Sequence, residues 1–421
     1  MLHNFLPLSV HGTELYTYYL AKELSKKHDV HVFFNLTDPA ETKSLVRGVY
    51  NDIPFTAINT NIIRYPDYTP PGHRHLIIEC LQELLSSFLP DVVHFQHILN
   101  LAPEIVKSVK TRKIPIVFTL NDYWLICHRA HMIRKNKKPC YSANQLKCML
   151  CHYYNSKSWL PKANTFNLSI NCLKKSYWHC LKEYENLRYF FDGRFREMRD
   201  IFQLVDFFIS PSNFLRNIFI RHGLNPDKIM HCKNGIRKIE YLRKHGMGRF
   251  QFGFMGGTAY HKGGHVLVKA FEKISDADLH IFGVVDEDKK YEFLNGVNNP
   301  NINFPGFVSE RAKQKALSEI DVLIVPSICF ESFSIVIQEA YMSGAPVIAS
   351  DIGAMAEFVK DGVTGLHFKV GDYKDLRRKI QYLIDNPQKV EEMRTNLPKV
   401  KTIEENTVEI ETIYASVVSH K

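Results

Sequence analysis

The chain has 421 residues, of which 45% are hydrophobic and 23% charged, a balance typical of a globular protein with two or three domains. It contains no recognisable signal sequence and no apolar run near the roughly eighteen residues of a membrane span. We therefore expect neither secretion nor a spanning helix, and we place the chain in the cytoplasm. Its nine cysteines, an odd number, argue against a disulfide framework.

The N-terminal residues predict the first helix and strand of a Rossmann-like domain. Apolar residues recur with helical spacing from Thr13 to Lys26, and Asp29–Phe34 has the composition of a buried strand. A Rossmann-like domain needs a strand before this helix, and only Met1–Phe5 can supply it. The sequence therefore predicts that the first strand is truncated.

Two further strands are predicted at Asp91–His97 and Ile114–Asp122, and each ends in polar residues. Ligands of open α/β sheets bind at the carboxyl ends of the strands. His97, Asn121 and Asp122 are therefore candidates for contact with a substrate. A hydrogen-bonded structural role is the alternative for a histidine at a strand end.

Residues 125–200 are rich in aromatic and basic side chains. They contain fifteen lysines and arginines against five aspartates and glutamates, an excess equal to the net charge of +10 of the whole chain. Such a segment can face an anionic membrane, a polyanionic glycan carrier or nucleic acid, or it can be a solvated surface. No nucleic-acid-binding motif is present, so we expect no nucleic-acid partner.

The same segment contains Cys127, Cys140, Cys148 and Cys151. The last two have C-x-x-C spacing, so a structural zinc bound by these four cysteines is one interpretation. The other spacings are irregular for a zinc ribbon, and ordinary buried cysteines are the alternative. Zinc at this place would hold a loop together and take no part in the chemistry.

The second half of the chain repeats the pattern of strand, glycine turn and helix. The strand that begins at Phe250 ends in Gly256 and Gly257, and His261-Lys262-Gly263-Gly264 then opens a helix. Lys262 can hold a diphosphate as a point charge, and a solvated loop lysine is the alternative. Further strands are predicted over residues 279–283 and 302–308.

The most informative stretch is Asp321–Phe368, which reads DVLIVPSICFESFSIVIQEAYMSGAPVIASDIGAMAEFVKDGVTGLHF. Asp321–Pro326 predicts a strand buried on both faces, because it is apolar and rich in β-branched residues. Ser334–Ser343 predicts a helix that stops at a glycine, and Ala345–Ser350 predicts the next strand. These elements form one βαβ unit.

The loop and helix of this unit predict a phosphate and sugar site. A helix N-terminus presents unpaired backbone N–H groups, here those of Phe333, Ser334 and Ile335, and so suits a phosphate. Glu339, within the helix, can accept two ribose hydroxyls, and Glu331, on the loop, can reach a sugar beyond the phosphates. The alternative makes both glutamates solvated surface residues. The apolar residues around Glu339 in the sequence argue against that alternative for this residue.

The whole stretch resembles the donor-site signature of retaining glycosyltransferases of family 4, the glycosyl transferases group 1. That family has the α/β GT-B fold, in which two Rossmann-like domains face a central cleft. The resemblance implies that Glu339 binds the nucleotide ribose and Glu331 contacts the transferred sugar. It also implies that Lys262 and the helix N-terminus neutralise a leaving diphosphate, with no catalytic metal or other cofactor.

The resemblance extends over most of the chain and implies a domain plan. Residues 1–233 correspond to an acceptor-binding domain, with residues 125–200 as a basic insertion. Residues 234–399 correspond to a domain that binds the nucleotide-sugar donor. Residues 400–421 correspond to a helix that crosses back to the first domain.

Several glycines and one apolar pair take roles from the same resemblance. Gly12 corresponds to one of two glycines that let the backbone approach the donor phosphates, although a simple turn is the alternative. Gly256 and Gly257 form the glycine turn of the donor domain. Phe307 and Val308 correspond to the segment that lies against the nucleotide base.

Two positions depart from the family pattern. The family has a histidine in its TLHDYW segment, where this chain has Asn121, and an amide can orient a hydroxyl but cannot take its proton. His97 is therefore the better candidate for a catalytic contact with the acceptor, with Asn121 and Asp122 beside it. Many relatives have an arginine where this chain has Gly257, which leaves Lys262 and backbone amides to hold the phosphates.

The sequence thus predicts a retaining, hexosyltransferase-type enzyme. It would move a sugar from a UDP- or GDP-linked donor to a hydroxyl of a glycan or lipid-linked glycan, in cell-surface polysaccharide synthesis. Residues 125–200 would bind peripherally to the anionic inner face of a membrane. A NAD-dependent oxidoreductase is disfavoured because neither domain has G-x-G-x-x-G after its first strand. A catalytically silent relative that binds a nucleotide or glycan remains the alternative.

Overall fold

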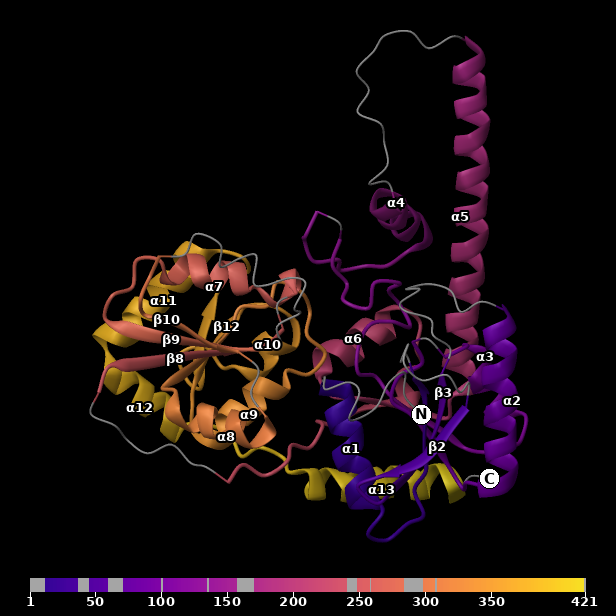
Figure 1. Cartoon of the computed structure of the whole chain (residues 1–421), viewed down its shortest axis with the longest axis horizontal. Helices are drawn as coiled ribbons and strands as arrows, with labels where there is room; N and C mark the ends of the chain where they lie inside the picture. Colours follow the sequence, from indigo (N-terminus) through magenta and orange to yellow (C-terminus); the bar gives the residue numbers. More distant parts are fainter. Residues whose placement is uncertain are drawn as a thin grey trace.

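The computed structural model of the chain has two lobes that are joined by two crossing segments (Figure 1). It describes residues 12–36, 45–59, 71–99, 101–134, 136–156, 170–240, 248–257, 259–283, 298–306 and 309–419. The predicted first strand, Met1–Phe5, lies outside these residues.

The C-terminal lobe is built on a six-stranded sheet in the order β10-β9-β8-β11-β12-β13, in which every pair of neighbours is parallel. Its central strands are buried along their whole length, because helices cover both faces of such a sheet. The sequence predicted these strands from their uninterrupted apolar runs. The strands are β8 (Phe250–Met255), β9 (Ala277–Phe282), β10 (Ile302–Gly306), β11 (Val322–Val325), β12 (Val347–Ser350) and β13 (Gly365–Phe368).

Helices and short 3₁₀ turns connect these strands. The α9 helix follows β11 and leads into β12, which confirms the predicted βαβ unit. Asp372 caps α11 by accepting hydrogen bonds from two first-turn amides, which fixes where that helix begins. The elements are η2 (Tyr260–Lys262), α7 (Gly264–Phe271), α8 (Glu310–Glu319), α9 (Ile335–Ser343), α10 (Gly353–Phe358), α11 (Tyr373–Asp385) and α12 (Pro387–Thr395).

The strands of the N-terminal lobe form two sheets among the residues that the structure describes. One is a parallel sheet in the order β4-β5-β6-β7, and the other has the order β1-β3-β2, with β2 antiparallel to β3. The hairpin of β2 and β3 was not predicted. The strands are β1 (Val32–Leu36), β2 (Leu45–Tyr50), β3 (Ile53–Asn59), β4 (Val93–Phe95), β5 (Ile116–Thr119), β6 (Phe207–Ser210) and β7 (Ile229–His231).

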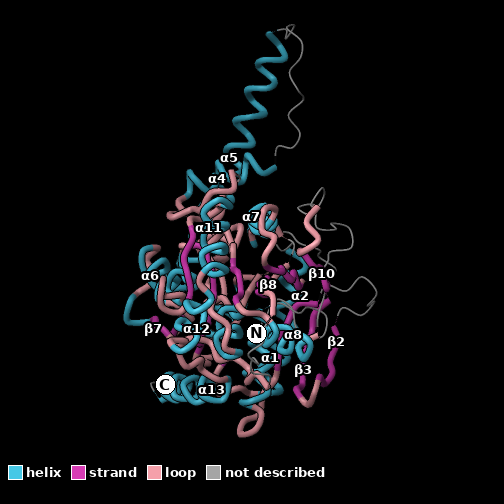
Figure 2. The backbone as a smooth tube through the Cα atoms, turned by 90° about the vertical axis from the view of Figure 1, so that its left-hand side faces the viewer, coloured by secondary structure: helices cyan, strands magenta, loops and turns pink. Residues whose placement is uncertain are grey.

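The helices of the N-terminal lobe include one that leaves the body of the molecule. The helix α5 spans 35 residues, and its first half projects far beyond both lobes in two perpendicular views (Figures 1 and 2). Together with α4 it makes up much of the basic insertion. The elements are α1 (Gly12–Leu24), α2 (Pro71–Phe88), α3 (Glu104–Lys110), α4 (Gln145–Ser156), α5 (Ile170–Leu204), α6 (Asn213–Arg221) and η1 (Pro226–Lys228).

The last helix, α13 (Ile403–Ser419), lies under the N-terminal lobe and packs against α1 (Figure 1). The buried Asn406 side chain ties α13 to the other crossing segment. It accepts hydrogen bonds from the Tyr16 hydroxyl at 2.9 Å and the Gly235 amide at 3.0 Å, and donates one to the carbonyl of Lys233 at 3.2 Å. A Cβ atom at Gly235 would lie 2.4 Å from the Thr402 carbonyl oxygen, so only glycine fits where the two segments cross.

Candidate active site

Two loops of the C-terminal lobe bring the predicted Lys262 and Glu331 into direct contact. They follow β8 and β11, which are neighbours in the sheet, so both loops lie at the same carboxyl edge. The Lys262 ammonium lies 2.9 Å from Glu331 Oε1, and the Ser327 hydroxyl donates to the same oxygen at 2.8 Å. The sequence predicted both charged residues but not their pairing.

The charge of Glu331 is fixed by this pairing. Burial opposes ionisation of the carboxyl group, but the Lys262 ammonium and the hydrogen bonds from Lys262 and Ser327 outweigh it and lower the pKa to about 2. Glu331 is therefore a carboxylate at any physiological pH. Its negative charge lies at the carboxyl edge of the sheet, where ligands of open α/β sheets bind.

Two helix N-termini meet beside this pair. The α9 helix begins at Ile335, so Phe333, Ser334 and Ile335 lie at its N-terminal turn, where backbone N–H groups have no carbonyl partner within the helix. Gly12, the first residue of α1, lies against Ile335, since a Cβ there would come within 3.1 Å of its Cδ1 atom. Both helix dipoles thus favour an anion at this point between the lobes.

Glu339 lies one turn into α9 and is only 7% exposed. Its Oε1 atom accepts a 2.6 Å hydrogen bond from Lys313 on α8, and Lys313 also pairs with Glu310 at 2.9 Å. The other oxygen, Oε2, is buried and has no hydrogen-bond partner among the described residues. A buried carboxylate oxygen without a donor destabilises the unliganded protein, so this atom is a ready acceptor for a ligand hydroxyl.

The glycine turn after β8 is open on one side. Gly256 donates its amide to Phe282 at 3.0 Å, which extends the sheet by one residue. Gly257 is exposed, and no atom lies within 4 Å of the position that its Cβ would take. Phe307 and Val308, predicted to lie against the base, are outside the described residues.

His97 and Asp122 meet at the ends of β4 and β5 in the N-terminal lobe. The Asp122 carboxylate lies 2.6 Å from His97 Nε2, and the Leu99 amide donates to His97 Nδ1 at 2.9 Å. Because Nδ1 accepts a proton donor, the hydrogen of the neutral ring is on Nε2 and points at Asp122. Burial opposes ionisation of Asp122, but His97 and the Trp124 amide lower its pKa. The carboxylate is therefore the proton acceptor of this pair.

Asn121 holds three parts of the chain together. Its Nδ2 atom donates to the Gln96 carbonyl at 2.9 Å, and its Oδ1 atom accepts from Asn234 in the crossing segment at 3.4 Å. Its backbone carbonyl accepts a hydrogen bond from the Ser332 hydroxyl of the donor-side loop. The amide side chain is thus engaged with Gln96 and Asn234, and the backbone carbonyl of Asn121 holds the Glu331 loop against the N-terminal lobe.

Two family models match this chain. The model described as Glycosyl transferases group 1 matches residues 239–400, and the model described as Glycosyltransferase Family 4 matches residues 10–153. The first contains Lys262 and Glu331, and the second contains His97 and Asp122. The chain belongs to this family of glycosyltransferases.

This glycosyltransferase also matches curated relatives over part of their length. It is 35% identical over 129 residues to the phosphatidyl-myo-inositol mannosyltransferase of Mycobacterium leprae, a match that covers 30% of this chain and 34% of that protein. The chain spans about half or less of the length of the curated relatives that it matches.

Solved structures share the fold of this glycosyltransferase along its whole length. Sucrose-phosphate synthase from Thermosynechococcus elongatus has a TM-score of 0.69 at 15% identity, covering 100% of this chain and 96% of that one. HepE of Anabaena, solved in complex with UDP and glucose, has a TM-score of 0.66 at 15% identity, covering 99% and 98% of the two chains. The predicted GT-B fold class is confirmed.

The predicted zinc site is not formed by the residues that the structure describes. Nowhere among them are three or more His, Cys, Asp or Glu side chains arranged to hold a metal ion, so Cys127, Cys140, Cys148 and Cys151 form no metal cluster. Cys148 packs with Met149 and Phe191 in a small apolar cluster. Burial raises the pKa of the Cys127 thiol and raises that of Cys148 to about 12.

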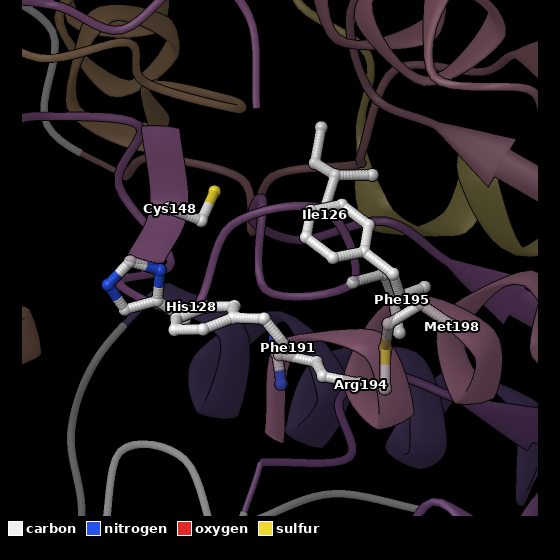
Figure 3. Close-up of a pocket in the computed structure, with 8 residues that line it drawn as sticks. Ile126, His128, Cys148, Phe191, Arg194, Phe195 and Met198 are labelled. Atoms are coloured by element: carbon white, nitrogen blue, oxygen red, sulfur yellow. The ribbon is translucent and has the colours of Figure 1, made fainter. Parts of the chain in front are cut away.

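The cysteine region instead anchors the projecting helix. Figure 3 shows a small pocket between the start of the insertion, α4 and the base of α5. The Arg194 guanidinium lies 4.6 Å from the centre of the Trp124 ring and donates to the Trp124 carbonyl. The lining is mostly apolar, so the pocket belongs to the packing of α5. The residues that line it are Leu125, Ile126, His128, Cys148, Phe191, Arg194, Phe195 and Met198.

Lys313 is a functional candidate that sequence reasoning missed. It lies on an exposed, charged helix, and only the fold brings it to Glu339. Burial and Glu310 raise the pKa of Glu339, while the Lys313 ammonium opposes them. Lys313 therefore favours the ionised form of Glu339, which is a stronger hydrogen-bond acceptor than the protonated form.

Replacing Lys313 with methionine should make nucleotide binding depend on pH. Without the ammonium the pKa of Glu339 rises further. As the pH is lowered, Glu339 of the variant therefore becomes protonated at a higher pH than Glu339 of the wild type. Affinity for a nucleoside diphosphate should therefore fall at acidic pH by on the order of tenfold and recover as the pH rises. Calorimetric titration at several pH values measures this shift.

Lys315→Met is the matched control, because Lys315 lies on the same helix and pairs only with the exposed Glu319, 3.7 Å away. Its pH profile should follow that of the wild type. A Lys313→Met profile parallel to the wild type at every pH would show that Lys313 has only a packing role.

Proposed function

We propose that this glycosyltransferase transfers a hexose from a UDP- or GDP-linked donor to a hydroxyl group of a glycan or lipid-linked glycan, with retention of the anomeric configuration. The observation that carries the proposal is the Glu339 carboxylate, with one buried oxygen that has no partner among the described residues. It lies on the helix whose N-terminus, beside Lys262 and Glu331, suits a diphosphate. A nucleoside diphosphate sugar has ribose hydroxyls, then a diphosphate, then the sugar. This order matches Glu339, then the start of α9 with Lys262, then Glu331.

The proposed chemistry uses these groups directly. The acceptor hydroxyl attacks the anomeric carbon from the face that the diphosphate leaves, and its proton passes to an oxygen of that diphosphate. Lys262 and the two helix N-termini stabilise the charge on the leaving group. Glu331 stabilises the positive charge that develops on the sugar in an oxocarbenium-like transition state.

The comparisons support the substrate classes. HepE, with the same fold, is solved with UDP and glucose, which supports a UDP-linked hexose as donor. The Mycobacterium leprae relative is named for an inositol lipid acceptor, which supports a lipid-linked acceptor here.

We further propose that the basic insertion binds the anionic inner face of a membrane from the cytoplasmic side. The α5 helix projects from the body of the molecule, which would allow such contact (Figure 2). Residues 125–200 contain fifteen basic and five acidic residues, and this positive charge would attract the segment to anionic lipid headgroups. No helix within the described residues is long and apolar enough to cross a membrane.

Thermal denaturation with added nucleotides tests the donor class. UDP or GDP, at a concentration near a hundred times the dissociation constant, should stabilise the chain by about 2.7 kcal/mol, whereas NAD should not. The Glu339→Ala variant should lose most of this stabilisation. Stabilisation by NAD alone would contradict the proposal and favour a dinucleotide-binding protein.

A further inference from the structure

Arg129 has no counter-ion among the residues that the structure describes. The residue is half-buried, and its Nη1 atom is buried without a hydrogen-bond partner among those residues. A buried N–H group without an acceptor destabilises a protein, most of all when the group is charged. The structure therefore holds Arg129 in a state that an anion would stabilise.

The loop that carries Arg129 reaches across to the donor lobe. We call residues 129–134 and 136–141 the bridging loop. Its Lys137 ammonium lies 3.6 Å from the centre of the Tyr260 ring, and its Tyr141 ring packs edge-on against Phe330 at 5.1 Å. These contacts place the loop over the glycine turn before α7 and over the loop that carries Glu331.

The backbone of the bridging loop is strained next to Arg129. Ala130 and Met132 have φ angles of +60° and +45°, a conformation that non-glycine residues rarely adopt. Hydrogen bonds from Ala130 N to the Cys127 carbonyl and from Cys140 N to the Met132 carbonyl hold this shape. Such strain persists where the surroundings fix it and is concentrated at binding sites.

Arg129 and Lys262 act on the same neighbours from opposite lobes. The His131 ring of the bridging loop stacks on His261 of the donor lobe with ring centres 4.4 Å apart. Burial is the largest cause that lowers the pKa of both histidines, and the Lys262 and Arg129 cations lower it further in both rings, although the Glu331 carboxylate opposes them. One cation from each lobe therefore lies near the stacked rings, and Lys262 alone has a carboxylate partner, Glu331.

We propose that Arg129 binds a phosphate group of a substrate at the interface between the two lobes. The proposal rests on the function proposed above, because the phosphate we assign to it is part of the nucleotide-sugar diphosphate. The guanidinium fork suits two phosphate oxygens at once. Since the other phosphate ligands, Lys262 and the start of α9, belong to the donor lobe, this contact would draw the N-terminal lobe onto the bound donor.

Calorimetric titration of the full chain with UDP, GDP, uridine and inorganic pyrophosphate tests the proposal. Arg129→Gln should weaken the nucleoside diphosphate that the wild type binds, and pyrophosphate, by about ten- to hundredfold, the effect of losing one charged hydrogen-bonded contact. Affinity for uridine should not change. Arg129→Lys keeps the charge without the fork and should lose only part of the affinity.

Arg134→Gln is the matched control, because Arg134 is an exposed arginine of the same loop. It should bind every probe as the wild type does. Unliganded Arg129→Gln should be at least as stable to heat as the wild type, since the substitution removes an unpaired charge. A loss of stability would indicate a structural role and contradict the proposal.

Two measurements distinguish a phosphate of the nucleotide donor from a phosphate of the acceptor. If UDP affinity is unchanged in Arg129→Gln but the UDP-saturated variant no longer binds inorganic phosphate, Arg129 binds an acceptor phosphate. Unchanged affinity for all these probes would overturn the inference and leave the proposed function standing. A wild type that binds no nucleoside diphosphate would overturn both.

Discussion

Replacing Glu331 with glutamine should lower the turnover of the nucleotide sugar by on the order of a hundred- to thousandfold. The substitution keeps the size of the side chain and removes the charge that pairs with Lys262 at 2.9 Å and that we propose faces the anomeric carbon. Binding of the free nucleoside diphosphate should change only a few-fold, because that ligand has no sugar to contact. The loss should therefore appear in kcat rather than in the affinity for the nucleotide.

The control is Glu319→Gln, which removes a carboxylate whose side chain is 64% exposed on α8. Its turnover should equal that of the wild type. If Glu331→Gln retained wild-type turnover, Glu331 would not contact the transferred sugar. If it instead lost nucleotide affinity with kcat unchanged, the carboxylate would serve only to place Lys262.

Replacing Gly263 with alanine should disable the donor site and destabilise the C-terminal lobe. Gly263 has a φ angle of +76°, and a Cβ there would lie 1.9 Å from the Pro326 carbonyl oxygen. The left-handed backbone alone costs roughly 1–2 kcal/mol for an L-residue, and relief of the clash must move the Lys262 turn away from the loop of Glu331. A displacement near 1 Å can lower activity by on the order of a hundredfold.

Gly257→Ala provides the comparison for this variant. Gly257 lies in the same glycine-rich connection, but its added Cβ would meet nothing within 4 Å, and its backbone is outside the left-handed region. The melting temperature of Gly257→Ala should stay near the wild-type value. Equal melting temperatures of the two alanine variants would contradict the close packing of Gly263 against Pro326.

The βαβ unit from β11 to β12 could be predicted because each of its signals is local. The strand is an uninterrupted apolar run, the helix ends at Gly344, and Pro346 follows before the next strand. The hairpin of β2 and β3 and the long α5 helix were not predicted. Their conformations depend on partners elsewhere in the fold and on side chains without a clear apolar period.

The candidate site could be predicted only as separate residues. Motif spacing identified Lys262, Glu331 and Glu339, but their pairings depend on which strands are neighbours. Lys313 and Arg129 carry no local signal that separates them from other surface cations. Lys313 becomes important because it pairs with the buried Glu339 on a neighbouring helix. Arg129 becomes important because its buried Nη1 atom has no partner among the described residues.

Zinc was one of two interpretations of the cysteines, and the described residues favour the other, ordinary buried cysteines. A C-x-x-C pair places two thiols near one another in the sequence, but it does not determine whether the side chains converge on a point open to a metal. Here Cys148 packs with Met149 and Phe191 in a small apolar cluster. The cysteines therefore contribute to the base of α5 rather than to a metal site among the described residues.

We propose above that the chain transfers a hexose from a nucleotide sugar, with retention, at the site of Glu331 and Glu339. The most direct test is ¹H NMR of a panel of UDP-, GDP- and ADP-hexoses incubated with the wild type, Glu331→Gln and Glu339→Ala. We predict that the wild type turns over one donor, that the released or transferred sugar first appears with the anomeric configuration of the donor, and that both variants lose this activity. Binding of a nucleotide without turnover of any donor would contradict the claim and favour a catalytically silent member of the family.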